Sequence, residues 1–81
     1  MSDFTARTPK QLGAILRGYR QERKLTQQAV GTGCGLPQGA ISQMESDPAT
    51  TSLTRIYRLL AALELELVIR PKSSGSKNTE W

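Results

Sequence analysis

The chain has no histidine and a single cysteine, Cys34, among its 81 residues. One cysteine cannot form an intrachain disulfide, and the usual zinc-ligand sets need several histidines or cysteines. There is also no phosphate-binding glycine loop followed by lysine, and no nucleophile with an evident base. We therefore expect no metal, no cofactor, no small-molecule substrate and no enzymatic activity, and we interpret Cys34 as a small apolar residue.

Long apolar runs are missing as well. No stretch approaches the roughly 20 apolar residues of a transmembrane helix, and the amino terminus lacks the apolar centre of a signal peptide. We expect a cytoplasmic protein without membrane association. A chain of this length forms one small domain that buries only about 60% of its unfolded surface, so dimerisation would help to stabilise it.

Positive charge is abundant and unevenly distributed. The formal net charge is +4, while residues 7–24 carry six basic side chains against the single acid Glu22. Such a basic stripe is typical of a surface that meets a phosphate backbone, but a solvated helix face has the same composition. The six basic residues are Arg7, Lys10, Arg17, Arg20, Arg23 and Lys24.

The middle of the chain predicts two short helices joined by a glycine turn. Thr26 can cap the first helix through its hydroxyl group, and Gly31 is small enough to let a second helix approach closely. Gly35 follows the last apolar residue of the first helix, where a left-handed backbone favours glycine. Pro37 presets φ for the first turn of a second helix, which we expect to begin near Gln38.

One face of that second helix carries small or amide-bearing side chains without charge, which suit the reading of base edges. These are Gln38, Gly39, Ser42 and Gln43, opposite the apolar residues Ile41 and Met44. An ordinary helical hairpin inside a small core is the alternative, because the apolar residues alone fit it equally well.

The spacing, the turn and the polar face together resemble the Cro/C1-type (lambda repressor-like) helix-turn-helix, whose second helix lies in the DNA major groove. The resemblance implies that Gln27 contacts phosphate, that Gln38 reads a base, and that Ser42 and Gln43 face the same groove. Pro37 and Gly39 depart from the common pattern, so DNA deformability would contribute to specificity. The expected DNA-binding residues are Arg17, Thr26, Gln27, Pro37, Gln38, Gly39, Ser42 and Gln43.

An earlier helix begins after Thr8, with Pro9 in its first turn and Gln11 as a capping-box partner, and ends near Lys24. Its apolar stripe is Leu12, Ile15, Leu16 and Tyr19. The Cro/C1 resemblance also implies an internal ion pair between Arg20 of this helix and Glu45, whereas two solvated charges are the alternative.

A polar connection over residues 47–50 precedes a fourth helix, which Thr51 or Ser52 can cap. The predicted apolar stripe of this helix is Leu53, Ile56, Tyr57, Leu60 and Leu63. Arg55 and Arg58 lie on its other side, where phosphate or an acidic protein partner would suit them equally.

After that helix, apolar and charged residues alternate up to Pro71, a period of two that predicts a short strand. No other segment offers a partner strand, so we expect the same strand of a second copy to pair with it, forming a homodimer through an intermolecular two-stranded sheet. A prolongation of the preceding helix is the alternative. The expected dimer-strand residues are Leu65, Leu67, Val68 and Ile69.

These elements predict an all-α domain over residues 8–70 with one short carboxy-terminal strand, between a flexible segment 1–7 and a disordered polar tail 71–81. The tail ends on Trp81, an exposed aromatic that we expect either to dock on a partner or to mark the chain for degradation.

From Thr8 onward, the chain resembles the HipB-type antitoxins. The resemblance rests on the helix-turn-helix, on a turn similar to NPxTT at residues 47–51, on the ALELEL segment at 62–67, and on the terminal Glu80 and Trp81. It implies a transcriptional repressor, associated with the nucleoid, that binds double-stranded operator DNA as a dimer and holds a HipA-type kinase toxin inactive. A stand-alone repressor and a protein-interaction module that has lost DNA binding are the alternatives.

Overall fold

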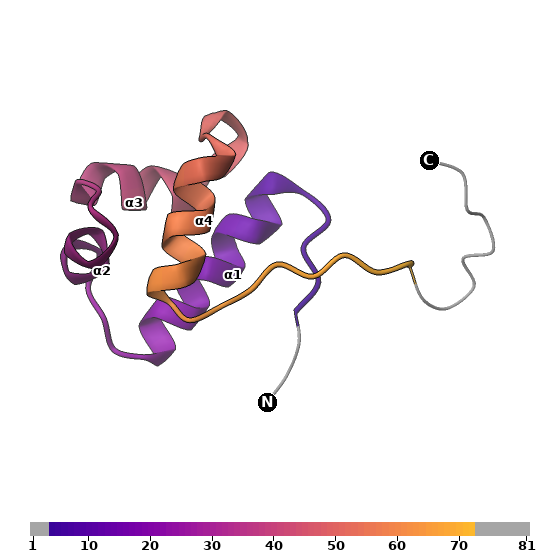
Figure 1. Ribbon diagram of the computed structural model, residues 1–81, viewed down its shortest axis with the longest axis horizontal. Helices are drawn as coiled ribbons and strands as arrows, with labels where there is room; N and C mark the ends of the chain where they lie inside the picture. Colours follow the sequence, from indigo (N-terminus) through magenta and orange to yellow (C-terminus); the bar gives the residue numbers. More distant parts are fainter. Residues whose placement is uncertain (1–3, 73–81) are drawn as a thin grey trace.

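Residues 4–72, the part of the chain that the computed structural model describes, contain four α-helices and one 3-10 turn (Figure 1). In chain order they are α1 (Pro9–Glu22), α2 (Gln27–Cys34), α3 (Gln38–Ser46), the 3-10 turn η1 (Pro48–Thr50) and α4 (Leu53–Ala62). The predicted all-helical arrangement is confirmed. Trp81 lies outside the described residues, as do all predictions about residues 73–81.

Three of the helices begin at the hydroxyl caps that local sequence predicts. Thr8, Thr26 and Ser52 each accept a hydrogen bond from the backbone amide three residues further on, over distances of 3.1, 3.0 and 3.2 Å. The capping box before α1 is displaced by one residue, because the Gln11 side chain accepts from the backbone amide of Arg7 at 2.6 Å rather than from that of Thr8. Hydroxyl caps therefore set these helix starts.

Three helices end with a residue in the left-handed backbone region. Gly35 follows α2 with φ of +72°, as predicted, while Lys24 after α1 and Glu64 after α4 both have φ of +59°. In each case the next residue donates its amide back to a carbonyl of the last turn, as Leu65 does to Leu60 at 2.8 Å. This is the Schellman arrangement, which satisfies backbone groups that a helix end would otherwise leave unpaired.

The core lies among the four helices, with α3 packed against α1 and α2, and α4 packed against α2. Its buried apolar residues are Leu16, Val30, Leu36, Ala40, Ile41, Met44, Leu59, Leu60 and Leu63, with Cys34 packed at its edge. The predicted stripe of α4 is wrong in part, because Leu53 and Tyr57 are 61% and 49% exposed whereas Leu59, outside that stripe, is fully buried. The spacing of apolar residues in α4 fits more than one choice of buried face, because neighbouring faces of the helix carry apolar residues too. Packing of α4 against α2 buries the face that includes Leu59.

Close backbone packing joins α1 to α3 at Gly13. A Cβ atom at this glycine would lie 2.7 Å from the carbonyl oxygens of both Met44 and Glu45, well inside the usual carbon contact distance of about 3.5 Å or more. Gly13 thus sets how near α1 can lie to the last turn of α3.

The segment after α4 leaves the helix but forms no strand in the described part of this single chain. Helix α4 ends at Ala62, so a helix running through residues 64–69 is wrong. The predicted strand at 65–69 is not formed here either, because a strand needs a hydrogen-bonded neighbour and no segment within residues 4–72 supplies one. The segment crosses past α1 and leads away from the helices (Figure 1).

Candidate nucleic-acid interface

The turn between α2 and α3 is held by close contact between backbones. A Cβ atom at Gly31 would lie 2.5 Å from the carbonyl oxygen of Leu36, so a larger residue would force the two helices apart. The amide of Leu36 donates to the carbonyl of Gly31 at 2.8 Å, and the Leu36 side chain is buried in the core. These contacts fix the direction in which α3 leaves the turn.

The amino-terminal end of α3 presents backbone amides rather than a capping side chain. Pro37 is the N-cap, with ψ of 156°, so its predicted place in the first helical turn is off by one residue. No side chain caps this helix, and Gln38 and Gly39 of its first turn are exposed. Because amides and dipole both make a helix start attractive to negative groups, this end suits phosphate oxygens or base acceptors.

The exposed face of α3 is the polar face that the sequence predicts. Gln38, Gly39 and Gln43 are exposed and Ser42 is partly buried, whereas Ile41 on the other side is fully buried. A Cβ atom at Gly39 would meet no atom within 4 Å. The fold therefore does not require glycine at this position, which leaves close approach to a ligand as a reason for it.

A chain of side-chain hydrogen bonds runs from this face into the protein. The Nε2 of Gln38 donates to Oε1 of Gln27 at 3.2 Å, and the Nε2 of Gln27 donates to Oε1 of Glu45 at 3.1 Å. The amide of Gln27 keeps one N–H and one lone pair for an external partner, and the amide of Gln38 keeps one N–H and both lone pairs of its oxygen. Gln27, predicted as a phosphate contact, is thus also the residue that orients Gln38.

The chain ends on a buried ion pair between α1 and α3. The guanidinium of Arg20 donates from Nε to Glu45 Oε2 at 2.6 Å and from Nη2 to Oε1 at 3.1 Å, and its Nη1 donates to the carbonyl of Leu25 at 2.7 Å. The two side chains are only 11% and 3% exposed. The bidentate geometry holds both charges in one arrangement, so the ion pair implied by the Cro/C1 resemblance is a fixed support beneath Gln27.

Three helices meet beside this pair around a polar hollow of about 280 Å³. It brings together the predicted residues Arg17 of α1, Gln27 of α2 and Ser42 of α3, with Arg20, Glu45 and Ser46 completing the wall. Arg17 is exposed at its edge. Because Glu45 is already matched by Arg20, Arg17 adds positive potential where a phosphate would pass.

The remaining predicted residues have structural partners of their own. The hydroxyl of Thr26 accepts from the amide of Ala29 as the α2 cap, and the Nε2 of Gln43 donates to the Thr50 hydroxyl at 3.3 Å. Gln43 therefore ties the exposed face of α3 to η1 as well as facing outward.

Sequence reasoning missed the two glutamines' mutual contact and the role of Gly13. The contact joins residues 11 positions apart on different helices, so no local pattern announces it. Gly13 did leave a signal, because an interior helix glycine costs roughly 1 kcal/mol relative to alanine and so calls for a packing reason.

Within residues 4–72 no group of three or more histidine, cysteine, aspartate or glutamate side chains could hold a metal ion. No helix in that range is long and apolar enough to cross a membrane.

Comparison with known proteins gives a consistent answer. A family model described as Helix-turn-helix matches residues 16–69. The Antitoxin HipB of Escherichia coli (strain K12) is 31% identical in an alignment of 80 residues, which covers 91% of this chain and 91% of its own. The corresponding antitoxin of E. coli O6:H1 is 30% identical over 91% of this chain and 85% of its own.

Solved structures agree with the sequence relatives. The protein in a "HipB-O4 20mer complex" superposes with a TM-score of 0.83 at 28% identity, over 88% of this chain and all of the other. The corresponding chain in a "Structure of HipA-HipB-O2-O3 complex" gives a TM-score of 0.79 at 27% identity, over 90% of this chain and all of that one. Antitoxins of this kind are regulators rather than enzymes. The chain belongs to the helix-turn-helix family and, within it, to the HipB-type antitoxins.

Proposed function

We propose that this chain is the antitoxin of a HipBA-like pair. As a homodimer it binds operator DNA and represses transcription, and it holds a HipA-type serine/threonine kinase inactive. The single observation that carries the DNA half is the exposed polar face of α3, with Gln38 oriented from below through Gln27 and Glu45. The relatives named with 20-mers and with HipA support the same assignment.

Direct readout would centre on Gln38. Its Nε2 already donates to Gln27, which leaves one N–H and the carbonyl oxygen of the amide facing outward. Such an amide can bind adenine at N6 and N7 together. Gly39 contributes no side chain and allows close approach, so part of the specificity would come from the shape and deformability of the operator.

Dimerisation sets the spacing of the two sites. Residues 8–70 would form the DNA-binding and dimerisation domain, and the strands at 65–69 of two copies would pair in a two-stranded sheet. Two α3 helices would then enter successive major grooves about 34 Å apart and select a palindromic site. Repression requires no catalytic step, because a dimer bound to this operator in the nucleoid blocks access of polymerase to the DNA.

A gel shift with the DNA upstream of the gene tests the DNA half. If each dimer neutralises about six to eight phosphates, the slope of log K against log salt should be about −5 to −7. A flat salt response, or equal affinity for unrelated DNA, would contradict specific operator binding.

Three variants separate readout from general charge. Gln38→Ala should cost about 1 to 3 kcal/mol on the operator and relax specificity at one base position, whereas Arg17→Ala should weaken binding to all sequences similarly. Arg58→Ala, which removes the same charge from exposed α4, is the matched control. If it weakens binding as much as Arg17→Ala, the place of Arg17 beside α3 is not special, and either net charge or a phosphate contact of Arg58 contributes equally.

The kinase half needs its own assay. Purified dimer should inhibit phosphorylation by a HipA-type kinase encoded beside the gene, at stoichiometric ratio. Operator binding without inhibition would leave a stand-alone repressor, and inhibition without operator binding would leave a protein-interaction module.

A further inference from the structure

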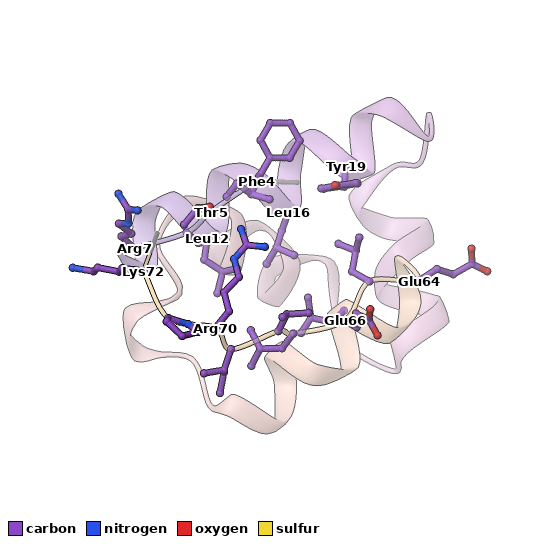
Figure 2. Close-up of a pocket in the computed structure, with 18 residues that line it drawn as sticks. Phe4, Thr5, Arg7, Leu12, Leu16, Tyr19, Glu64, Glu66, Arg70 and Lys72 are labelled. Carbon is purple, nitrogen blue, oxygen red and sulfur yellow. The ribbon is translucent and has the colours of Figure 1, made fainter. Parts of the chain in front are cut away.

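Every second residue of the segment after α4 is apolar, and the exposure of these side chains increases along the chain. Leu65 is partly buried, Leu67 is 50% exposed and Ile69 is 90% exposed. Figure 2 shows this segment along one side of a groove of about 820 Å³, with α1 and residues 4–7 along the other. No strand within residues 4–72 pairs with it. A surface of this kind is incomplete without a second strand.

Symmetry limits how a second copy can supply that strand. In a two-fold pair, any residue i opposite j requires j opposite i. Alternate side chains of a strand point to opposite faces of the sheet. A two-fold axis normal to the two-stranded sheet leaves each side chain on its own face, so even-numbered residues stand opposite even-numbered ones and odd-numbered opposite odd-numbered. The axis must therefore pass through a single residue of the segment, and each choice of residue is one register.

We propose that two copies pair antiparallel with the axis at Val68, which rests on the homodimer of the proposed function. This register sets Glu66 opposite the partner's Arg70, a pair that occurs twice in the dimer. Opposite charges directly across an antiparallel pair are stabilising. A guanidinium has five donors, so Arg70 can bind the partner's carboxylate in addition to the interaction that it makes within its own chain.

The neighbouring registers match charge less well. An axis through Leu67 leaves Glu66 opposite Val68. An axis through Ile69 sets Glu66 opposite the partner's Lys72 but leaves Arg70 opposite Val68. Axes through Glu66 or Arg70 place like charges directly across from each other, which is destabilising. Among these registers, only the axis at Val68 gives both charged residues of the segment 65–71, Glu66 and Arg70, a partner of opposite sign.

The other face of the same register is apolar. It places Leu67 opposite the partner's Ile69, which would cover the most exposed side chains of the segment. Leu12, Ile15 and Tyr19, partly buried along the groove, form a floor on which this face can pack. In an antiparallel ladder, pairs that exchange backbone hydrogen bonds alternate with pairs that do not. The pairs of the apolar face include Pro71, which has no amide to donate, so they are the pairs without hydrogen bonds, and the facing Val68 residues form a hydrogen-bonded pair.

Cysteine cross-linking of the full chain in a Cys34→Ala background tests the register. Facing Val68 residues would have Cα atoms about 5.5 Å apart, within the disulfide range of about 4.4 to 6.8 Å. We expect Val68→Cys to oxidise almost completely to a covalent dimer. Leu67→Cys alone should stay monomeric on a non-reducing gel, because its Cα atoms would be about 7 to 8 Å apart. Mixing Leu67→Cys with Ile69→Cys should restore the cross-link.

Sedimentation equilibrium under reducing conditions separates the two hypotheses. If the reduced chain is monomeric, the homodimer of the proposed function fails. If it is dimeric and Leu67→Cys cross-links in place of Val68→Cys, the dimer stands and the register proposed here is overturned. Val68 is 63% exposed, so its replacement leaves the helical core untouched.

A charge exchange gives an independent check. Glu66→Arg sets like charges opposite each other and should weaken dimerisation about 2- to 30-fold, since two symmetry-related pairs are lost. Arg70→Glu should do the same, and the double variant should recover the original dimer affinity. A double variant as weak as the sum of the single ones would contradict the pairing of these two positions.

Discussion

Replacing Gly13 by alanine should destabilise the protein, whereas the same replacement at Gly18 should stabilise it. Both glycines lie inside α1, so each change adds one methyl group to the same helix. At Gly13 the new Cβ atom would lie 2.7 Å from the carbonyl oxygens of Met44 and Glu45, and at Gly18 it would meet nothing within 4 Å. The pair therefore isolates the contact between α1 and α3.

The magnitude follows from two opposing terms. Glycine in a helix interior is less stable than alanine by about 0.5 to 1 kcal/mol, which both variants regain. Overpacking costs about 1 to 3 kcal/mol, and the backbone oxygens that Gly13→Ala would strike cannot swing aside as a side chain can. Subtraction of the two variants cancels the helix term, so Gly13→Ala should be less stable than Gly18→Ala by about 1 to 3 kcal/mol.

Urea unfolding followed by far-ultraviolet circular dichroism measures this difference, with both variants at one protein concentration because dimerisation contributes to stability. A difference of about 1 kcal/mol corresponds to about 4 to 8 °C in Tm for a domain of this size, so thermal unfolding provides a second reading. Equal stability of the two variants would refute the close approach of α1 to the end of α3.

The remaining predictions concern the ion pair and the helix ends. Glu45→Ala should cost about 3 to 5 kcal/mol because it leaves Arg20 buried without its carboxylate, while Arg20→Met combined with Glu45→Leu should recover most of that stability in urea unfolding. Gly35→Ala should destabilise by about 1 to 2 kcal/mol, since a side chain at positive φ is strained. Lys24→Gly and Glu64→Gly should each raise the free energy of unfolding by about 0.5 to 1 kcal/mol, as relief of the same strain exceeds the entropy lost by glycine. Unchanged thermal stability in both glycine variants would contradict the left-handed geometry at these two sites.

Local signals in the sequence were sufficient for most helix boundaries. Thr8, Thr26 and Ser52 cap the helices that they were expected to cap, and Gly35 has the left-handed backbone expected of it. These features depend on hydrogen bonds and torsions within a few residues, so a short stretch of chain contains the necessary information. The left-handed backbone of Lys24 escaped prediction because no glycine marks it.

Contacts between helices could not be predicted from these local signals. The order of residues determined that this chain forms a helix-turn-helix with a polar outer face on α3. Only the packing of α1 and α2 against α3 decided that Gly13 must be small and that Gln27 orients Gln38 above the buried pair of Arg20 and Glu45. Caps and turns are local interactions, whereas burial and side-chain partners depend on which helix faces meet in space, and several faces of an amphipathic helix satisfy the same periodicity.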